Sequence, residues 1–312
     1  MMVWHVVKRS AVLMLVATLS IPTTTQNAAR AATQETPLSE SFLPGDSIEA
    51  VPMAGWDVTD AGGSRTLSAS GQGAVDQAPN DASRFTQKSY DFPTGSIRVL
   101  EFNKANGGMI HVLTDETTLY MLKGEGTVEV AGETVSINQG DAVSYPSGTL
   151  RGDGDGTAIL WVVTGNDIEG EPKPKVVRSV DTTFAQMGYW PNPDGGDRIL
   201  VTTAEELKDA PAHAIRLDMR NYAFDDNGLV VTKNYKSGPT NKSRGNRDAL
   251  LYIASGKMRW FQDDIDVTAV PGDAIRETAG RYHNWIRMED SSFIGIGTAP
   301  AAPLEPEAAS DY

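Results

Sequence analysis

The sequence reads GDAVSYPSGTLR at residues 140–151 and GDAIRETAGRYH at residues 272–283. The two stretches are 132 residues apart (272 minus 140), and the same shift places Leu119-Tyr120 on Leu251-Tyr252. No gap is needed from Val99/Val231 to Trp161/Phe293. A register that holds across two turn regions indicates one supersecondary unit used twice.

Short segments with alternating or apolar character surround both stretches. They span 97–102, 127–130 and 158–163 in the first copy and 229–231, 258–261 and 293–296 in the second. Glycine-rich turns such as 106–108 and 152–156 separate them. Several short strands at close spacing predict an all-β fold with one antiparallel barrel or sandwich per copy.

The composition along the chain predicts where these units begin and end. We expect a signal peptide at 1–31, an irregular N-terminal arm at 32–83, a first barrel at 84–170, a linker at 171–215, a second barrel at 216–298 and a disordered tail at 299–312. One short helix is expected in the linker, because Thr203 and Glu206 form a capping box and Pro211 follows. The arm is rich in Gly, Ser, Ala, Asp and Pro. It could cover a barrel, exchange with a second subunit of a homo-oligomer, or stay disordered.

The first residues are typical of an export signal. Lys8-Arg9 precedes the apolar run 10–21, and Ala29-Arg30-Ala31 offers a cleavage site. The run is shorter than the ~20 residues of a spanning helix, so we expect no membrane association after leader removal; a retained amphipathic anchor is the alternative. The chain has no cysteine, so no disulfide framework supports it. We therefore predict a periplasmic or secreted protein.

The charge of the chain argues against one class of partner. The formal net charge is -14. An acidic chain without a basic stripe repels phosphate backbones, so nucleic-acid binding is not expected. A small molecule is the expected partner.

The two copies resemble the cupin barrel, whose second motif is G-D-x-x-x-x-P-x-G-x-x-H. The first copy matches at Gly140-Asp141, Pro146 and Gly148, with Arg151 at the histidine position; the second matches at Gly272-Asp273, Gly280 and His283. Residues 117–124 (TTLYMLKG) resemble the family's E-x-x-Y-V-L-x-G segment. The resemblance implies two tandem jelly-roll-like cupin barrels, a bicupin.

The same resemblance implies a divalent metal held by three His and one Glu. The corresponding residues are His111, Leu113, Thr117 and Arg151 in the first barrel and Ser243, Gly245, Ala249 and His283 in the second. One ligand of four remains in each barrel, and a guanidinium would repel the cation, so we predict no metal and no cofactor. A loop shift that recruits Asp115 or Glu116 is the alternative.

The two surviving histidines are the candidate catalytic residues. His283 and His111 could each act as a general base in a dry barrel interior. Strand alternation would send Trp285 and Arg287 inward with His283. The candidate ligand-binding residues are Arg151, Ser243, Arg244, Trp285 and Arg287. Alternatively, the histidines are relics with a hydrogen-bond partner, and Arg244 is a solvated loop charge.

Two hypotheses follow for function. The first is a metal-independent bicupin that binds or converts a sugar acid or an aromatic acid, as a lyase or isomerase with a His base and Tyr235 or Tyr282 as the acid. The second is a non-catalytic binding or structural protein, like the metal-free seed storage globulins of the family that the chain resembles. A pocket with His283 near a Tyr, Asp or Glu would favour the first hypothesis. An interior filled by Leu113, Leu251, Ile253 and Trp285 would favour the second.

Overall fold

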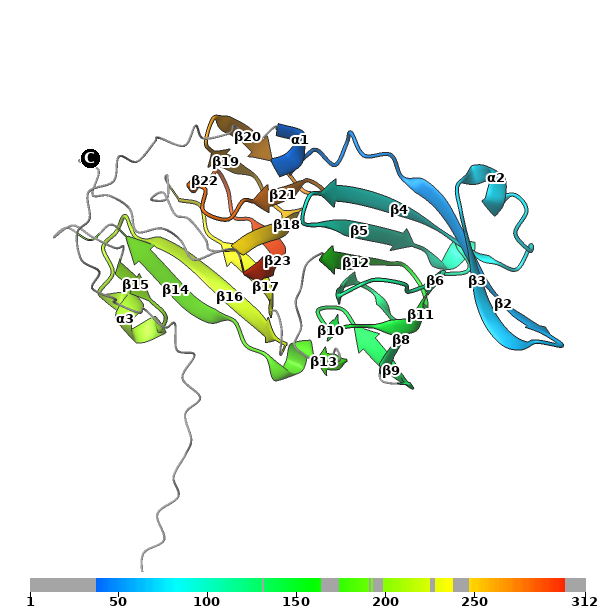
Figure 1. Cartoon of the computed structure of the whole chain (residues 1–312). Coiled ribbons are helices and arrows are strands. Elements are labelled where there is room, and N and C mark those ends of the chain that lie inside the picture. Colours follow the sequence, from blue (N-terminus) through cyan, green and yellow to red (C-terminus); the bar gives the residue numbers. More distant parts are fainter. Residues whose placement is uncertain are drawn as a thin grey trace, which may run out of the picture. The chain divides into compact units, whose positions relative to one another are not determined.

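Strands dominate the residues that the computed structural model describes, which are 38–130, 132–163, 174–190, 192, 199–224, 228–237 and 247–300. The prediction of an all-β chain is confirmed (Figure 1). All described residues belong to one unit, Glu35–Tyr312. No helix within the described ranges has the length and apolar character to cross a membrane. The predicted signal peptide at 1–31 lies outside these ranges.

Barrel 1 consists of an eight-stranded and a four-stranded antiparallel sheet. The large sheet has the order β13 (Lys175–Val177), β10 (Ala142–Ser144), β7 (Thr118–Lys123), β12 (Gly156–Val163), β5 (Gly95–Phe102), β4 (Ser83–Phe92), β2 (Val51–Asp60) and β3 (Gly63–Ser70). The small sheet has the order β6 (Met109–Val112), β11 (Ser147–Gly152), β8 (Glu125–Val130) and β9 (Glu133–Asn138). Apolar side chains from both sheets, among them Leu100, Leu119, Leu150 and Leu160, form one buried core.

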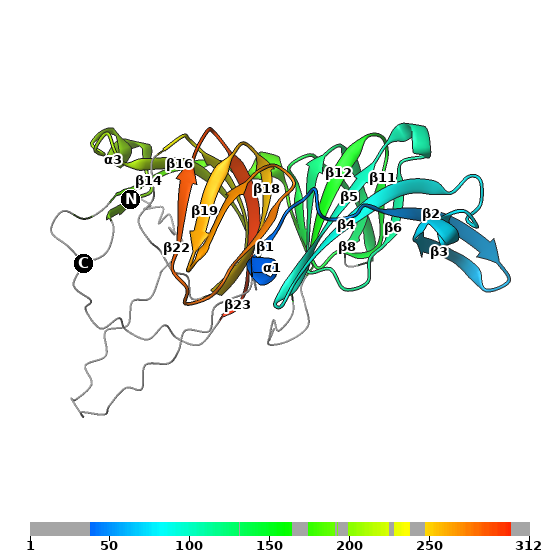
Figure 2. The same ribbon diagram turned by 90° about the horizontal axis from the view of Figure 1, so that it is seen from above.

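Barrel 2 repeats this plan with a smaller second sheet. Its large sheet has the order β1 (Phe42–Leu43), β21 (Ala274–Glu277), β18 (Arg247–Ser255), β23 (Ser292–Pro300), β17 (Gly228–Asn234), β16 (Ile215–Ala223), β14 (Ala185–Trp190) and β15 (Ile199–Val201). The small sheet is β20 (Ile265–Ala269), β19 (Met258–Gln262) and β22 (His283–Arg287). The core between them includes Leu251, Ile253, Trp260 and Trp285. Figure 2 shows the two barrels from above.

The helices are short, and the predicted one is present. They are α1 (Leu38–Ser41), α2 (Gln72–Val75), α3 (Ala204–Lys208) and the 3₁₀ turns η1 (Lys104–Asn106) and η2 (Ser179–Asp181). The Thr203 hydroxyl accepts from the Glu206 amide (3.3 Å) and donates to its carboxylate (2.7 Å). The capping box therefore begins α3 as expected.

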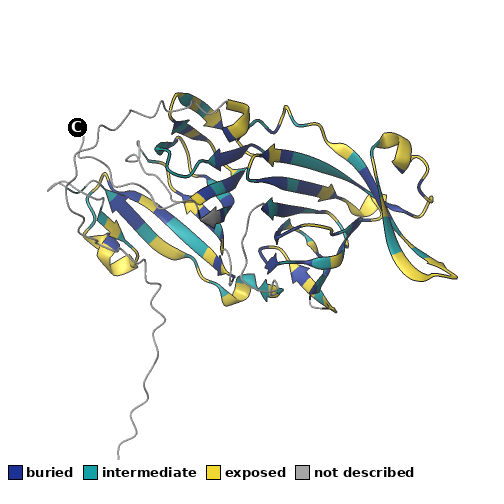
Figure 3. Ribbon diagram, viewed as in Figure 1, coloured by how far each residue is buried: buried dark blue, intermediate teal, exposed yellow. Residues whose placement is uncertain are grey.

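The expectation of an irregular arm over 32–83 is wrong for the residues of that segment that the structure describes, 38–83. Residues 51–70 form the β2–β3 hairpin at the edge of the large sheet of barrel 1, and its tip is exposed (Figure 3). Residues 42–43 pair with β21 of barrel 2. The linker expected at 171–215 also contributes strands, because β13 pairs with β10 while β14 and β15 extend the sheet of barrel 2. Sheet pairing satisfies the backbone N–H and C=O groups of these polar segments. Backbone hydrogen bonding does not require an apolar pattern, so these strands carry little signal in the sequence.

The repeated Gly-Asp pair has the same structural role in both copies. Asp141 accepts from the backbone amide of Asn138 (3.0 Å), and Asp273 accepts from the amide of Val270 (2.8 Å). Burial raises the pKa of Asp273. Burial acts in the same direction on Asp141, but backbone amides and the Arg178 guanidinium (2.9 Å) outweigh it and lower the pKa of this carboxyl. The motif aspartates therefore close turns and do not line the barrel interior.

The gap-free register between the copies fails before the last strand. Ile159 pairs with Tyr120 in the first copy, and Ile294 pairs with Tyr252 in the second. The tyrosines are 132 positions apart (252 minus 120), whereas the isoleucines are 135 apart (294 minus 159). The second copy thus has three additional residues before β23.

The two barrels share a hydrophobic core formed by the outer faces of their large sheets. It includes Trp161 from β12 and Tyr222 from β16, both fully buried. The Trp161 indole donates to the carbonyl of Leu250 (3.3 Å), and the Tyr222 hydroxyl donates to the carbonyl of Gly140 (2.5 Å). Each barrel therefore satisfies polar groups of the other.

Candidate functional site

The residues best placed for chemistry lie where β21 ends and β22 begins in barrel 2. Glu277 accepts a hydrogen bond from the Trp285 indole nitrogen (2.7 Å), and its Oε1 lies 3.4 Å from Nε2 of His283. The side chains of His283 and Glu277 are 11% and 16% exposed, so both are largely desolvated but reachable. We call Glu277, His283 and Trp285 the barrel-2 dyad site, after its carboxylate–imidazole pair.

Strand geometry explains why these three side chains meet. β22 alternates so that Trp285 and Arg287 are buried, which confirms the predicted inward direction of both residues. The turn before β22 is held by Gln262, whose amide donates to the Thr278 hydroxyl (3.1 Å) and accepts from the Thr278 backbone (2.9 Å). Gln262 also pairs with His283 across the sheet. The histidine therefore starts its strand in a defined position.

A carboxylate on one imidazole nitrogen determines what the other nitrogen can do. With Nε2–H directed at Glu277, the lone pair of a neutral imidazole lies on Nδ1, and this atom is buried, so a substrate must displace its neighbours to reach it. The carboxylate would also stabilise the imidazolium after proton uptake. The Trp285 indole holds the carboxylate in place. This arrangement suits general acid–base chemistry.

No motif in the sequence marks Glu277 as the partner of His283. Glu277 stands in the motif at the position of Tyr145 of the first copy, two residues after the inward-facing Ile275. This alternation was the available signal. The two tyrosines expected as the acid are less well placed than Glu277. Tyr235 is 42% exposed and donates to Asp218 (2.7 Å), and Tyr282 directly precedes β22.

His111 lies in the interior of barrel 1 beside Glu116. Its Nε2 is 3.7 Å from Oε1 of Glu116, and neither ring nitrogen has a hydrogen-bond partner among the described residues. Burial would raise the pKa of Glu116, but the His111 imidazole and the backbone amides of Thr114 and Asp115 lower it to about 2. Arg98 neutralises this carboxylate at 3.0 Å. The Glu116 side chain is fully buried, so a substrate cannot reach this pair without a rearrangement.

The prediction that Arg151 points into barrel 1 with His111 is wrong. Arg151 donates to Asp57 (2.8 Å) on the β2–β3 hairpin, outside the core. Leu150 occupies the interior instead and is fully buried opposite His111. Strand alternation allows only one of two neighbours to face inward, and the leucine gains more from burial than a guanidinium would.

Arg287 does not join the dyad site, although it points into the barrel. It lies four residues along β22 from His283, about 13 Å away in an extended strand. Its Nε donates to Asn234 (3.1 Å) on β17. Of the other predicted ligand-binding residues, Trp285 is in the site, whereas Ser243 and Arg244 lie outside the described residues.

The barrel interiors are packed with hydrocarbon. Leu113 belongs to the core of barrel 1, and Leu251, Ile253 and Trp285 belong to that of barrel 2. The feature that favours catalysis, a histidine beside a carboxylate, is therefore present, and so is the feature that favours a structural role, a filled interior. The dyad site lies at the partly exposed end of a filled barrel.

The donor set does not fit the metal that the cupin resemblance implies. No position in the described ranges gathers three or more His, Asp or Glu side chains. His111 and Glu116 provide two donors with a guanidinium beside them, and His283 and Glu277 provide two. Residues 238–246 (GPTNKSRGN), outside the described part, contain no His, Cys, Asp or Glu. A first-row metal needs more donors than either pair offers.

Solved structures resemble this chain, although no protein-family model and no curated protein matches its sequence. HEPD from Streptomyces albus, solved with its substrate 2-hydroxyethylphosphonate and Fe(II), has a TM-score of 0.52 at 10% identity over 86% of this chain and 78% of its own. The putative glyoxylate-induced protein from Pseudomonas aeruginosa has a TM-score of 0.51 at 11% identity over 88% and 96%. Protein YlbA from E. coli has a TM-score of 0.50 at 12% identity over 70% and 85%.

These likenesses to cupin-type structures confirm the fold that the motifs indicated. The chain has the cupin fold, in two tandem barrels. At identities of 10–12%, these likenesses show the fold alone and assign no role to the residues of the site.

Proposed function

We propose that the barrel-2 dyad site binds a small organic acid, of the sugar-acid or aromatic-acid class, and that His283 transfers a proton there without a metal. The single observation that carries this proposal is the contact of His283 with Glu277 at 3.4 Å, between side chains that are 11% and 16% exposed. The reaction class would be a lyase or isomerase, because a neutral imidazole can take a proton from a carbon next to a carbonyl. The cupin fold supports small-molecule chemistry in general, and the donor set favours proton transfer over metal chemistry.

Substitution of His283 by Gln is expected to lower turnover at least 100-fold, because a general base typically contributes a factor of 10²–10⁴. Purified protein would be incubated with a panel of uronic and phenolic acids, and product formation followed by proton NMR. Glu277→Gln keeps an acceptor for the Trp285 indole but removes the charge, so it should lower turnover with a changed pH profile.

The matched control is His111→Gln in barrel 1, which should keep wild-type turnover because His111 is enclosed. Dialysis against EDTA should also leave turnover unchanged. If the His111 variant is the inactive one, or if EDTA abolishes turnover, this assignment of the site and mechanism is wrong.

A second candidate function is non-catalytic binding or a structural role. The observation in its favour is the packed interior of both barrels. The same panel separates the two: a ligand that raises the melting temperature and is recovered unchanged supports binding alone.

We also propose export to the periplasm or the medium, supported by the charge, apolar run and small residues of 1–31. Cell fractionation with N-terminal sequencing of the purified protein tests it. A cytoplasmic protein that begins at Met1 would contradict export.

A further inference from the structure

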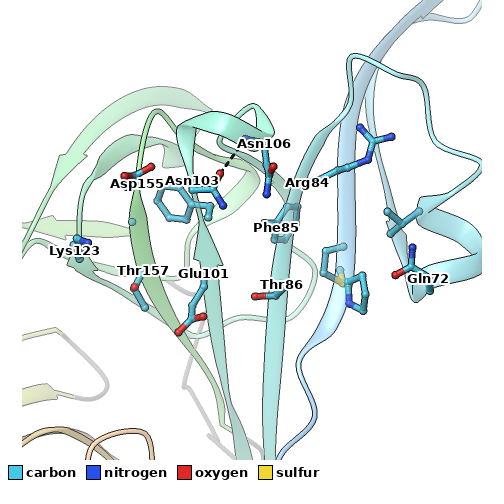
Figure 4. A pocket seen from close by; sticks show the side chains of 15 residues that line it. Gln72, Arg84, Phe85, Thr86, Glu101, Asn103, Asn106, Lys123, Asp155 and Thr157 are labelled. Carbon is cyan, nitrogen blue, oxygen red and sulfur yellow. Dashed lines mark hydrogen bonds between the residues drawn. The ribbon is translucent and has the colours of Figure 1, made fainter.

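A pocket of about 590 Å³ lies against barrel 1, with neither His111 nor His283 in its lining, and we call it the outer pocket. Figure 4 shows its lining from β2, β4, β5, β7 and β12, with Gln72 from α2 at one side. Its volume falls within the range of pockets that hold small molecules. Nothing in the proposed function uses it.

Four polar side chains form a row along one wall of the outer pocket. Thr86 pairs with Glu101, Glu101 with Thr157, and Thr157 with Lys123 on four neighbouring strands. Side chains of directly paired residues share a face of the sheet. The row therefore presents a carboxylate and an ammonium group on either side of a hydroxyl.

Some side chains that line the outer pocket already make hydrogen bonds within the protein, and others do not. Arg84 donates to the backbone carbonyls of Ala82 (3.1 Å) and Pro79 (3.3 Å). Asn103 and Asp155 accept from backbone amides of η1. Within the described ranges, no hydrogen bond or ion pair engages the side chains of Glu101 and Lys123. The two free groups carry full and opposite charges.

Strand spacing keeps these two charges from neutralising each other. Neighbouring strands are about 4.8 Å apart, so Glu101 and Lys123, with β12 between them, have backbones about 10 Å apart. Both residues are exposed, yet they make no ion pair with each other or with any other described residue. Space between two opposite charges suits a ligand that carries the complementary pair.

We infer that the outer pocket binds a small zwitterion, such as an amino acid or a dipeptide, with its ammonium group on Glu101 and its carboxylate on Lys123. A simple anion would meet Glu101 and Asp155, and a simple cation would meet Lys123 and Arg84. Only a ligand with both charges gains a charge-assisted hydrogen bond at each end. The Thr86 and Thr157 hydroxyls lie on the same wall and can accept or donate further bonds.

Titration calorimetry with glycylglycine tests this inference. The wild-type protein is expected to bind it, and Glu101→Gln and Lys123→Gln should each weaken binding roughly tenfold or more, because each removes one charge-assisted hydrogen bond. Lys104→Gln and Glu133→Gln are matched controls, since both residues are exposed outside the pocket. Both controls should bind like the wild type, and so should His283→Gln, which separates this site from the dyad site.

Acetate and methylammonium, each carrying one of the two charges, complete the test. Both should bind at least tenfold more weakly than glycylglycine. Absence of glycylglycine binding at millimolar concentration overturns the inference. So does equal binding of acetate with no effect of Glu101→Gln, which would indicate an anion site on Lys123 alone.

Discussion

Replacing Trp161 by alanine is expected to lower the free energy of unfolding by about 3–5 kcal/mol. Trp161 is fully buried in the core that the two barrels share, and its indole nitrogen donates to the Leu250 carbonyl of barrel 2. The substitution removes a large aromatic surface, leaves a cavity between two sheets and removes the indole hydrogen bond to the Leu250 carbonyl. Few residues in the described part combine these three losses.

Chemical denaturation followed by circular dichroism measures this effect. Trp161→Phe is the informative control, because it keeps most of the apolar volume and removes only the indole donor; a loss of about 1–2 kcal/mol is expected. Leu200→Ala, at a side chain that is 47% exposed, should change stability little. A loss below 1 kcal/mol for Trp161→Ala would mean that the barrels do not depend on this shared core.

Acidification from about pH 4.5 to about pH 2 is expected to remove about 3 kcal/mol of stability through Glu116 alone. Its pKa is lowered from the ordinary 4.5 to about 2 in the folded protein, where the nearby imidazole and backbone amides outweigh the effect of burial. Between these values the unfolded chain binds a proton that the folded chain does not. Stability therefore falls as the pH falls through this window, and the contribution is complete above it.

Glu116→Gln makes this prediction specific. The variant should be less stable at pH 7 and should show a shallower dependence of unfolding free energy on pH between 4.5 and 2. Glu133→Gln, at an exposed position of β9, should keep the wild-type dependence. Parallel pH curves for the Glu116 variant and the wild type would show that this carboxylate titrates normally in the folded protein.

Local patterns were sufficient for the strands, the duplication and the capped helix. The apolar runs 97–102 and 158–163, the turn glycines and the Thr203–Glu206 box each involve a few adjacent residues, so they can be recognised along the sequence. The inward direction of Trp285 and Arg287 followed from the same period of two. The cupin motifs then placed these strands in two barrels.

Tertiary contacts decided the arm and the site. The polar residues 51–70 carry a weak apolar pattern, and sheet pairing with β4 determines their structure. The pairing of β11 with β6 places Leu150 opposite His111 in the interior, so Arg151 faces Asp57 outside the barrel. The contact of Glu277 with His283 depends on how β21 turns into β22.

The sequence alone determined the duplication, the strand character and the scarcity of metal donors, because period, spacing and residue type are properties of neighbours along the chain; the cupin fold was implied by the resemblance of its motifs. The dyad site and the outer pocket were decided only by the tertiary structure. In the outer pocket, strand pairing holds Glu101 and Lys123 apart on either side of β12, and in the dyad site the turn from β21 into β22 brings Glu277 to His283.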